Sequence, residues 1–290
     1  MKAGELVEQY KKGLRDFEGV DLSRENLTGA SLFRANLSSA NLSEATLSCA
    51  NLNEINFQSA ILTTAVLYRT SLSRANLSAA NLEGASLIKA NLHKANLAQS
   101  NLKDADLTGA NLNGSQMMQA DLSGANLSGI FLTGASLESA NLSETFLKGA
   151  NLDGANLDGA NLESANLSGA SLSDTNLSNT NLSNTNLSNA NLYGANLSNA
   201  NLVGADLNGA NLSHANLTGA DLNGADLNGA FLAEATLTSA SLDGANLSKT
   251  NFYKASLNGA NLLRANLNGA NLNGTNLTGA ELYATAEAVE

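Results

Sequence analysis

The sequence predicts an all-β solenoid, a chain wound into stacked coils around one apolar axis, with a short helix before the first coil. Three observations predict it. Leu occupies every position whose number ends in 2 or 7 from 17 to 282, without insertion or deletion, except at Phe17, Phe57, Met117 and Phe252. Ala usually stands two residues before this central residue, and Asn or Asp stands directly before it. The two residues that follow are mostly Ser, Asn, Asp, Thr and Gly, which favour turns.

A period of five excludes the regular structures. On an α-helix, residues five apart are rotated by about 140°, so the leucines would form no apolar stripe. On a straight strand, an odd period sends alternate leucines to opposite faces. A chain that bends once per repeat avoids both problems, because every central residue (position 0) then points to one axis. The residue at −2 shares that inward side, the residue at −1 points outward, and those at +1 and +2 form the turn.

The amino-terminal residues predict a lid, because a stack of repeats leaves its ends uncovered. Residues 3–12 are predicted to form a helix that caps the first coil and ends at Gly13. Four apolar residues share its helical spacing: Leu6, Val7, Tyr10 and Leu14. Three residues replace the expected Ala beneath this cap and mark an irregular junction: Arg15, Val20 and Glu25.

The repeated phrase A(N/D)LxG resembles the pentapeptide-repeat family over residues 15–284. The resemblance implies a right-handed quadrilateral β-helix with four repeats per coil, hence about 13 coils. The expected organisation is an N-terminal helical cap at 1–14, the β-helix at 15–284 and a tail at 285–290. The ending YATAEAVE is a weak lid, so this end is a candidate for pairing with a second copy as a homodimer.

Composition bears on the compartment. Cys49 is the only cysteine, so no intrachain disulfide framework exists. The start MKAGELVEQYKKG carries Glu5 and Glu8 where a signal peptide needs an apolar run. No window approaches the roughly 18 apolar residues of a membrane span. The triplets NLS and NLT would be glycosylation acceptors in a eukaryotic secretory pathway. A bacterial-type cytoplasm, without membrane attachment, is therefore expected.

The formal net charge is −11, and it is unevenly distributed. Residues 1–110 hold 11 basic and 11 acidic side chains, whereas residues 111–290 hold 4 basic and 15 acidic ones. An acidic surface repels nucleic acid, so direct DNA or RNA binding is disfavoured.

No catalytic, cofactor or metal site is expected. Both histidines, His93 and His214, fall on the side centred on Leu32 and Leu52, but about six coils and roughly 29 Å apart. Cys49 has no His in its own or the next coil, and no phosphate-binding or metalloprotease motif is present.

Departures from the repeat mark candidate contact residues for a protein partner. Five aromatic residues fall on the histidine side, at outward positions: Phe33, Phe131, Tyr193, Phe231 and Tyr253. Aromatic residues anchor protein interfaces, although ordinary drift on a tolerant surface explains the set equally well. Four basic residues, Arg69 and Lys89 on one side and Arg74 and Lys94 on the next, are expected to gather along one edge as the coils stack, as a docking site for an acidic partner or simply as solvated turns.

Three functions fit this surface. The leading hypothesis is a non-enzymatic scaffold that presents flat sides to an unidentified protein. The resemblance implies the same, because most family members have no assigned activity and many occur in cyanobacteria, some tied to differentiation and stress. The second is gyrase binding by DNA mimicry, known in the quinolone-resistance branch of the family. The charge density beyond residue 110 counts against it, because it is less than half that of a DNA duplex, which carries one charge per roughly 1.7 Å. The third is ice or surface binding by a flat polar side that carries Asn176, Ser178, Asn196, Ser198, Asn216, Thr218, Thr236 and Thr238.

Overall fold

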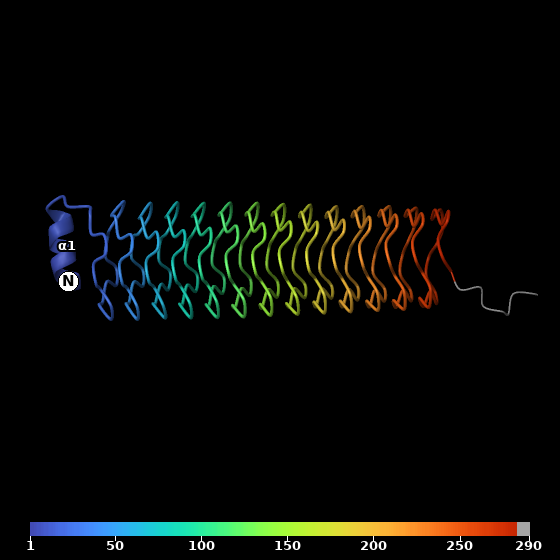
Figure 1. Ribbon diagram of the computed structural model, residues 1–290, viewed down its shortest axis with the longest axis horizontal. Coiled ribbons are helices and arrows are strands. Elements are labelled where there is room, and N and C mark those ends of the chain that lie inside the picture. Colours follow the sequence, from blue (N-terminus) through green and yellow to red (C-terminus); the bar gives the residue numbers. More distant parts are fainter. Residues whose placement is uncertain (283–290) are drawn as a thin grey trace, which may run out of the picture. The chain divides into compact units, whose positions relative to one another are not determined.

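The computed structural model of the protein describes residues 1–282, and Figure 1 shows one short helix followed by repeated coils. The chain falls into two units, Met1–Asn156 (unit 1) and Leu157–Glu290 (unit 2), both built from the same five-residue repeat. The predicted end of the solenoid at residue 284 and the predicted tail at 285–290 lie outside the described residues.

Helix α1 spans Ala3–Lys11 and lies at the amino-terminal end of the coils of unit 1 (Figure 1). Its inner face buries Ala3 and Leu6. The chain leaves the helix through Gly13, whose φ of 100° suits glycine. Leu14 shares the helical spacing of Leu6, Val7 and Tyr10 in the sequence but not their place in the structure. Leu14 lies beyond the helix and is 45% exposed, because the chain has already turned towards the first coil.

Glu25 explains the irregular junction beneath the cap. Its Oε2 accepts the backbone N–H of Ala3 at 2.9 Å, one of the donors that the first turn of a helix leaves without an internal partner. Its Oε1 accepts the Lys2 ammonium at 2.8 Å. These bonds lower the pKa of Glu25, the backbone bond contributing most. A carboxylate thus stands where Ala is usual because it fastens α1 to the coil.

Coils pair through residues twenty apart. Parallel bridges join the −1 residues of successive coils, such as Asp21 with Asn41 in unit 1 and Asn161 with Asn181 in unit 2. Within residues 1–282 these bridges are isolated, so the coils are held by single paired residues rather than by long strands. Four repeats therefore complete one coil in each unit.

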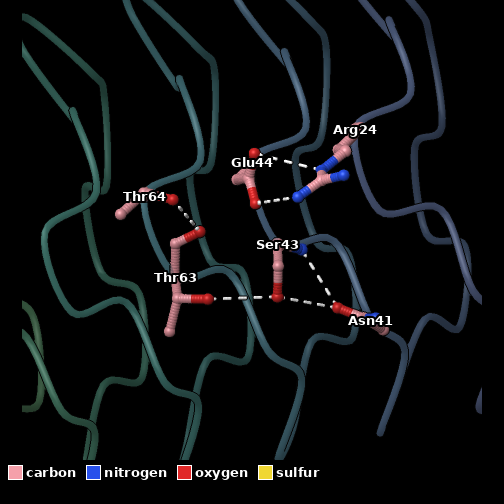
Figure 2. A network of polar contacts seen from close by, with 6 residues as sticks. All are labelled: Arg24, Asn41, Ser43, Glu44, Thr63 and Thr64. Carbon is pink, nitrogen blue, oxygen red and sulfur yellow. Dashed lines mark hydrogen bonds and ion pairs between the residues drawn. The ribbon is translucent and has the colours of Figure 1, made fainter.

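In repeat 41–45, every backbone N–H finds an acceptor. Asn41, Leu42 and Glu44 donate to carbonyls of neighbouring coils at 2.9, 2.7 and 2.9 Å. Ala45 closes the turn by donating to the Leu42 carbonyl at 3.0 Å. Ser43 donates to Oδ1 of Asn41 at 3.1 Å (Figure 2). This last bond is an Asx turn, and it explains why the repeat needs Asn or Asp at −1.

The corners are turns with one left-handed residue. At every +2 position from Gly19 to Gly279, φ is positive, whether or not the residue is glycine. A positive φ at the third residue of a four-residue turn is the signature of a type II turn. Glycine is favoured here, but Asn, Ser and charged residues occupy many corners.

The central residues form the core, as predicted. Leu37, Phe57 and Met117 have no exposed surface, like most of their counterparts. Ile55 and Ile130 replace the inward Ala without making a bulge, because both retain the usual turn hydrogen bond, at 3.2 and 3.1 Å. Each side chain simply fills interior space.

Candidate interaction surface

Three exposed aromatic side chains lie on one side of unit 2. Tyr193, Phe231 and Tyr253 are 44%, 51% and 42% exposed. Parallel bridges from Asn191 through Asn211 and Phe231 to Asn251 place their coils in direct register. We call these three residues the aromatic side of unit 2. Large apolar side chains exposed together on one surface are typical of protein contact sites.

The backbone holds the two tyrosines in equivalent positions. The Tyr193 N–H donates to Asn191 Oδ1 at 3.3 Å, and the Tyr253 N–H donates to Asn251 Oδ1 at 3.1 Å. Both tyrosines therefore occupy the +1 position of a regular repeat. Ser213 and Ala233 take that position in the two coils between them. Small residues therefore separate the two tyrosines along this position.

His214 borders this aromatic side. Its ring meets the Tyr193 ring edge-on, with the centroids 5.1 Å apart and the planes inclined by 62°. Its Nδ1 lies 3.7 Å from Oε2 of Glu234 in the next coil. His214 thus forms an exposed polar margin to the aromatic side.

The two candidate aromatics of unit 1 are separated. Five bridge steps link the coil of Phe33 to that of Phe131, about 24 Å at the usual strand spacing. Phe33 lies near the cap, where its carbonyl accepts the Tyr10 hydroxyl at 2.9 Å. The guanidinium of Arg34 lies 4.8 Å from its ring centroid. The structure brings together only the three aromatics of unit 2.

Phe131 instead edges a shallow depression of about 350 Å³. Its lining includes Lys89, Asn91, Asn111 and Asn113. Lys89 and Phe131, predicted as members of different groups, therefore share one recess. Phe131 itself is 48% exposed.

The four basic candidates occupy two corners rather than one edge. Arg69 and Arg74 stand at the +2 positions of successive turns, closed by bonds from Thr70 to Leu67 and from Ala75 to Leu72. Lys89 and Lys94 take the same two positions one coil later. The expectation of a single edge is wrong, because residues five apart lie at neighbouring corners and only residues twenty apart stack.

Asn side chains of the preceding coil are a second source of turn acceptors, which the repeat pattern did not predict. Phe131 cannot supply the Asx bond, and the Thr133 N–H donates instead to Asn113 Oδ1 of the preceding coil, at 2.9 Å. The same arrangement joins the Ser73 N–H to Asn53 Oδ1 at 2.8 Å and the Asp243 N–H to Asn223 Oδ1 at 3.0 Å. The signal is readable in the sequence: an Asn eighteen residues before a −1 position that lacks Asn or Asp.

Over residues 1–282, no three His, Cys, Asp or Glu side chains gather into a group that could hold a metal ion. No helix in the same part of the chain has the length and apolar character needed to cross a bilayer.

The repeat geometry agrees with comparison to known families. The family model described as pentapeptide repeats matches in successive segments that run from residues 16–48 to residues 245–283. The chain belongs to the pentapeptide-repeat family. Pentapeptide-repeat proteins form right-handed quadrilateral β-helices, and in general they are structural or interaction proteins rather than enzymes.

Solved pentapeptide-repeat structures are similar to this chain. HetL from the cyanobacterium Nostoc sp. strain PCC 7120, involved in heterocyst differentiation regulation, is 30% identical over 97% of both chains, with a TM-score of 0.27. A pentapeptide-repeat protein of the Arabidopsis thaliana thylakoid lumen is 31% identical over 37% of this chain and 67% of its own, with a TM-score of 0.28. QnrB1, a plasmid-mediated fluoroquinolone resistance protein, is 21% identical over 62% of this chain and 90% of its own, with a TM-score of 0.35. A search of curated proteins found no match to this chain.

Proposed function

We propose that this pentapeptide-repeat protein is a non-enzymatic scaffold that binds a partner protein through the aromatic side of unit 2. The observation that carries the proposal is the exposure of Tyr193, Phe231 and Tyr253 on coils held in register. Rigid aromatic rings lose little conformational entropy when they bind, which makes them effective anchors. The regular backbone hydrogen bonds around them fix their positions before a partner arrives.

The test replaces each aromatic residue by one that the repeat uses at the same position. The variant Tyr193→Ser/Phe231→Asn/Tyr253→Ser should fold, because Ser and Asn occupy these positions in neighbouring repeats. Partners are captured from the native host with the unaltered chain, and each is then measured against the triple variant. Loss of a partner with the triple variant supports the proposal.

A matched control alters apolar residues on other sides. The variant Ile61→Asn/Val66→Asn/Met118→Ser removes three exposed apolar side chains of unit 1, which are 42%, 37% and 40% exposed. It should retain every partner that the triple variant loses. Equal capture by the unaltered chain and the triple variant would contradict the proposal.

The proposal includes self-association through the carboxyl-terminal end. Leu262 is 2% exposed, whereas Leu282, the last described residue, is 45% exposed. Apolar surface of this kind is stabilised when it is covered. Light scattering over a range of concentrations tests the pairing: a mass that stays at one chain throughout would count against a homodimer.

A cytoplasmic site of action is also proposed. It is supported by a single, exposed cysteine, Cys49, which suits a reducing compartment. Gyrase binding and ice binding stay predictions of the sequence. A supercoiling assay and an ice-growth assay, respectively, measure them directly.

A further inference from the structure

A frame of four cations borders one side of unit 1. Arg69 and Lys89 stack at one corner, and Arg74 and Lys94 stack at the next. We call these four residues the basic frame. The side between the two corners carries only neutral Ser and Asn residues and the half-buried His93 at its −1 and +1 positions. The frame therefore encloses a strip that is polar but free of carboxylates.

The charges of the frame are not neutralised within the described chain. Residues 1–282 contain no ion pair to any of its four members, all of which are exposed. Two other arginines of unit 1, Arg24 and Arg34, are paired with carboxylates. Arg24 pairs with Glu44 at 3.0 Å, as Figure 2 shows. Glu54, which precedes Arg74 in the same corner column, is engaged by Arg34 at 2.6 Å.

The lysine side chains of the frame extend over the coil beyond it. Its two corner residues are Gly109 and Gly114, and a Cβ at these positions would lie 3.7 Å from Cγ of Lys89 and 3.4 Å from Cγ of Lys94. The depression that Lys89 shares with Phe131 opens there, with amide side chains of Asn91, Asn111 and Asn113 in its lining. One cation of the frame, Lys89, thus lines a recess together with amides and an exposed ring.

We propose that the basic frame binds an acidic, extended segment of a protein partner, with an apolar side chain of that segment against Phe131. The corners are five residues apart, a span of at most about 17 Å, and the cations within each column are about 4.8 Å apart. A small anion can reach one pair but hardly both columns, whereas an extended chain crossing the side places carboxylates at each. Complementary charges of this kind guide and orient association.

The charge of the whole chain argues against nucleic acid as the occupant. The net charge is −11, and the basic frame covers only two coils. A nucleic acid strand long enough to gain affinity would pass onto acidic parts of the surface. The inference rests on the proposed function only in treating the chain as a protein-binding scaffold, since it uses unit 1 and none of the aromatic side of unit 2.

The experiment uses the full chain and a fluorescein-labelled peptide of about twelve residues, alternating Glu and Ser with one central Leu, which when extended crosses the side. Binding is followed by fluorescence anisotropy at about 50 mM and about 300 mM NaCl. The same peptide with Gln for Glu, and a single-stranded oligonucleotide of similar length, are the comparison probes.

Two double variants divide the basic frame: Arg69→Asn/Lys89→Asn and Arg74→Asn/Lys94→Asn. These substitutions should not disturb folding, because Asn already occupies corners with the same φ near 56°, as at Asn179 and Asn189. The matched control is Lys249→Asn/Lys254→Asn, which removes two cations from corners of unit 2, where φ is 58° and 55°.

We expect each frame variant to weaken acidic-peptide binding roughly fivefold or more at low salt, and the control to leave it within about twofold. The triple variant of the aromatic side should bind the peptide like the unaltered chain, which separates this inference from the proposed function. Absence of peptide binding, equal weakening by the control, or equal binding of the Gln peptide would overturn the proposal. Tighter binding of the oligonucleotide than of the acidic peptide would also overturn it, because the occupant would then be nucleic acid. A mass that rises with protein concentration in light scattering, and no longer does so in the frame variants, would make the occupant a second copy of the chain.

Discussion

Replacing Asn113 by Ala tests how a coil compensates for an aromatic residue at the Asx position. Asn113 Oδ1 accepts the Thr133 N–H at 2.9 Å, because Phe131 offers no acceptor. An intramolecular hydrogen bond of this kind contributes about 0.5–1.5 kcal/mol. About 1 kcal/mol corresponds to a factor of about five in an opening equilibrium. Native-state hydrogen exchange should therefore show the Thr133 amide exchanging about five times faster in Asn113→Ala.

A double-mutant cycle makes this prediction specific. In the background Phe131→Asn, the new amide can form the usual Asx bond to Thr133, so adding Asn113→Ala should change the exchange by less than about twofold. Asn208→Ala is the matched control, since the amide one coil later, that of Asn228, donates to Asp226 Oδ1 at 3.0 Å. The reasoning is refuted if Asn113→Ala leaves the Thr133 amide unchanged, or if both backgrounds respond equally.

Three further predictions concern the core, the cap and the corners. Leu187→Ala should lower the free energy of unfolding by about 2–5 kcal/mol, since Leu187 is fully buried, and urea denaturation measures the loss. Because the pKa of Glu25 is lowered in the folded chain, Glu25 should stabilise the docking of α1 at pH values above the ordinary Glu pKa, and this stabilisation should be lost as the pH falls through the lowered pKa. Hydrogen exchange at the Ala3 amide measures this pH dependence, and Glu25→Gln should abolish it. A pH dependence unchanged in Glu25→Gln would contradict the assignment. Ala79→Gly should stabilise the protein and Gly129→Ala should destabilise it, each by about 1 kcal/mol, because φ is 54° and 62° at these corners and a left-handed φ favours glycine. No atom lies within 4 Å of a Cβ added at Gly129, so the effect there comes from the backbone and not from a clash. Thermal unfolding temperatures that shift the same way in both variants would contradict this.

Much of the fold was predictable because the repeat is strictly local. The spacing of the central residues indicated a bend every five residues, and the residues after each Leu indicated turns. Glu25, out of place in the pattern, marked the junction with the cap, where it binds the N–H of Ala3. Leu14 is exposed although it shares the helical spacing in the sequence, because the chain leaves the helix before it.

The candidate surface was predictable in part. Position in the repeat identified Tyr193, Phe231 and Tyr253 as outward residues of one side, and all three are exposed. The same reasoning placed the basic residues on one edge, although Arg69 and Arg74 stand at different corners. Nearness in the sequence did not place these basic residues correctly, because residues five apart lie at neighbouring corners and point in different directions.

The sequence by itself determined which residues face the core and where the chain turns, because both depend on neighbours within one five-residue repeat. Only the tertiary structure decided which polar groups satisfy each other between coils. Asn113 bonds Thr133, and Lys89 lies beside Phe131, because stacking brings distant parts of the chain into register. The physical reason is that these outward side chains have partners in a neighbouring coil, twenty or so residues away, and such contacts are made only when the coils stack.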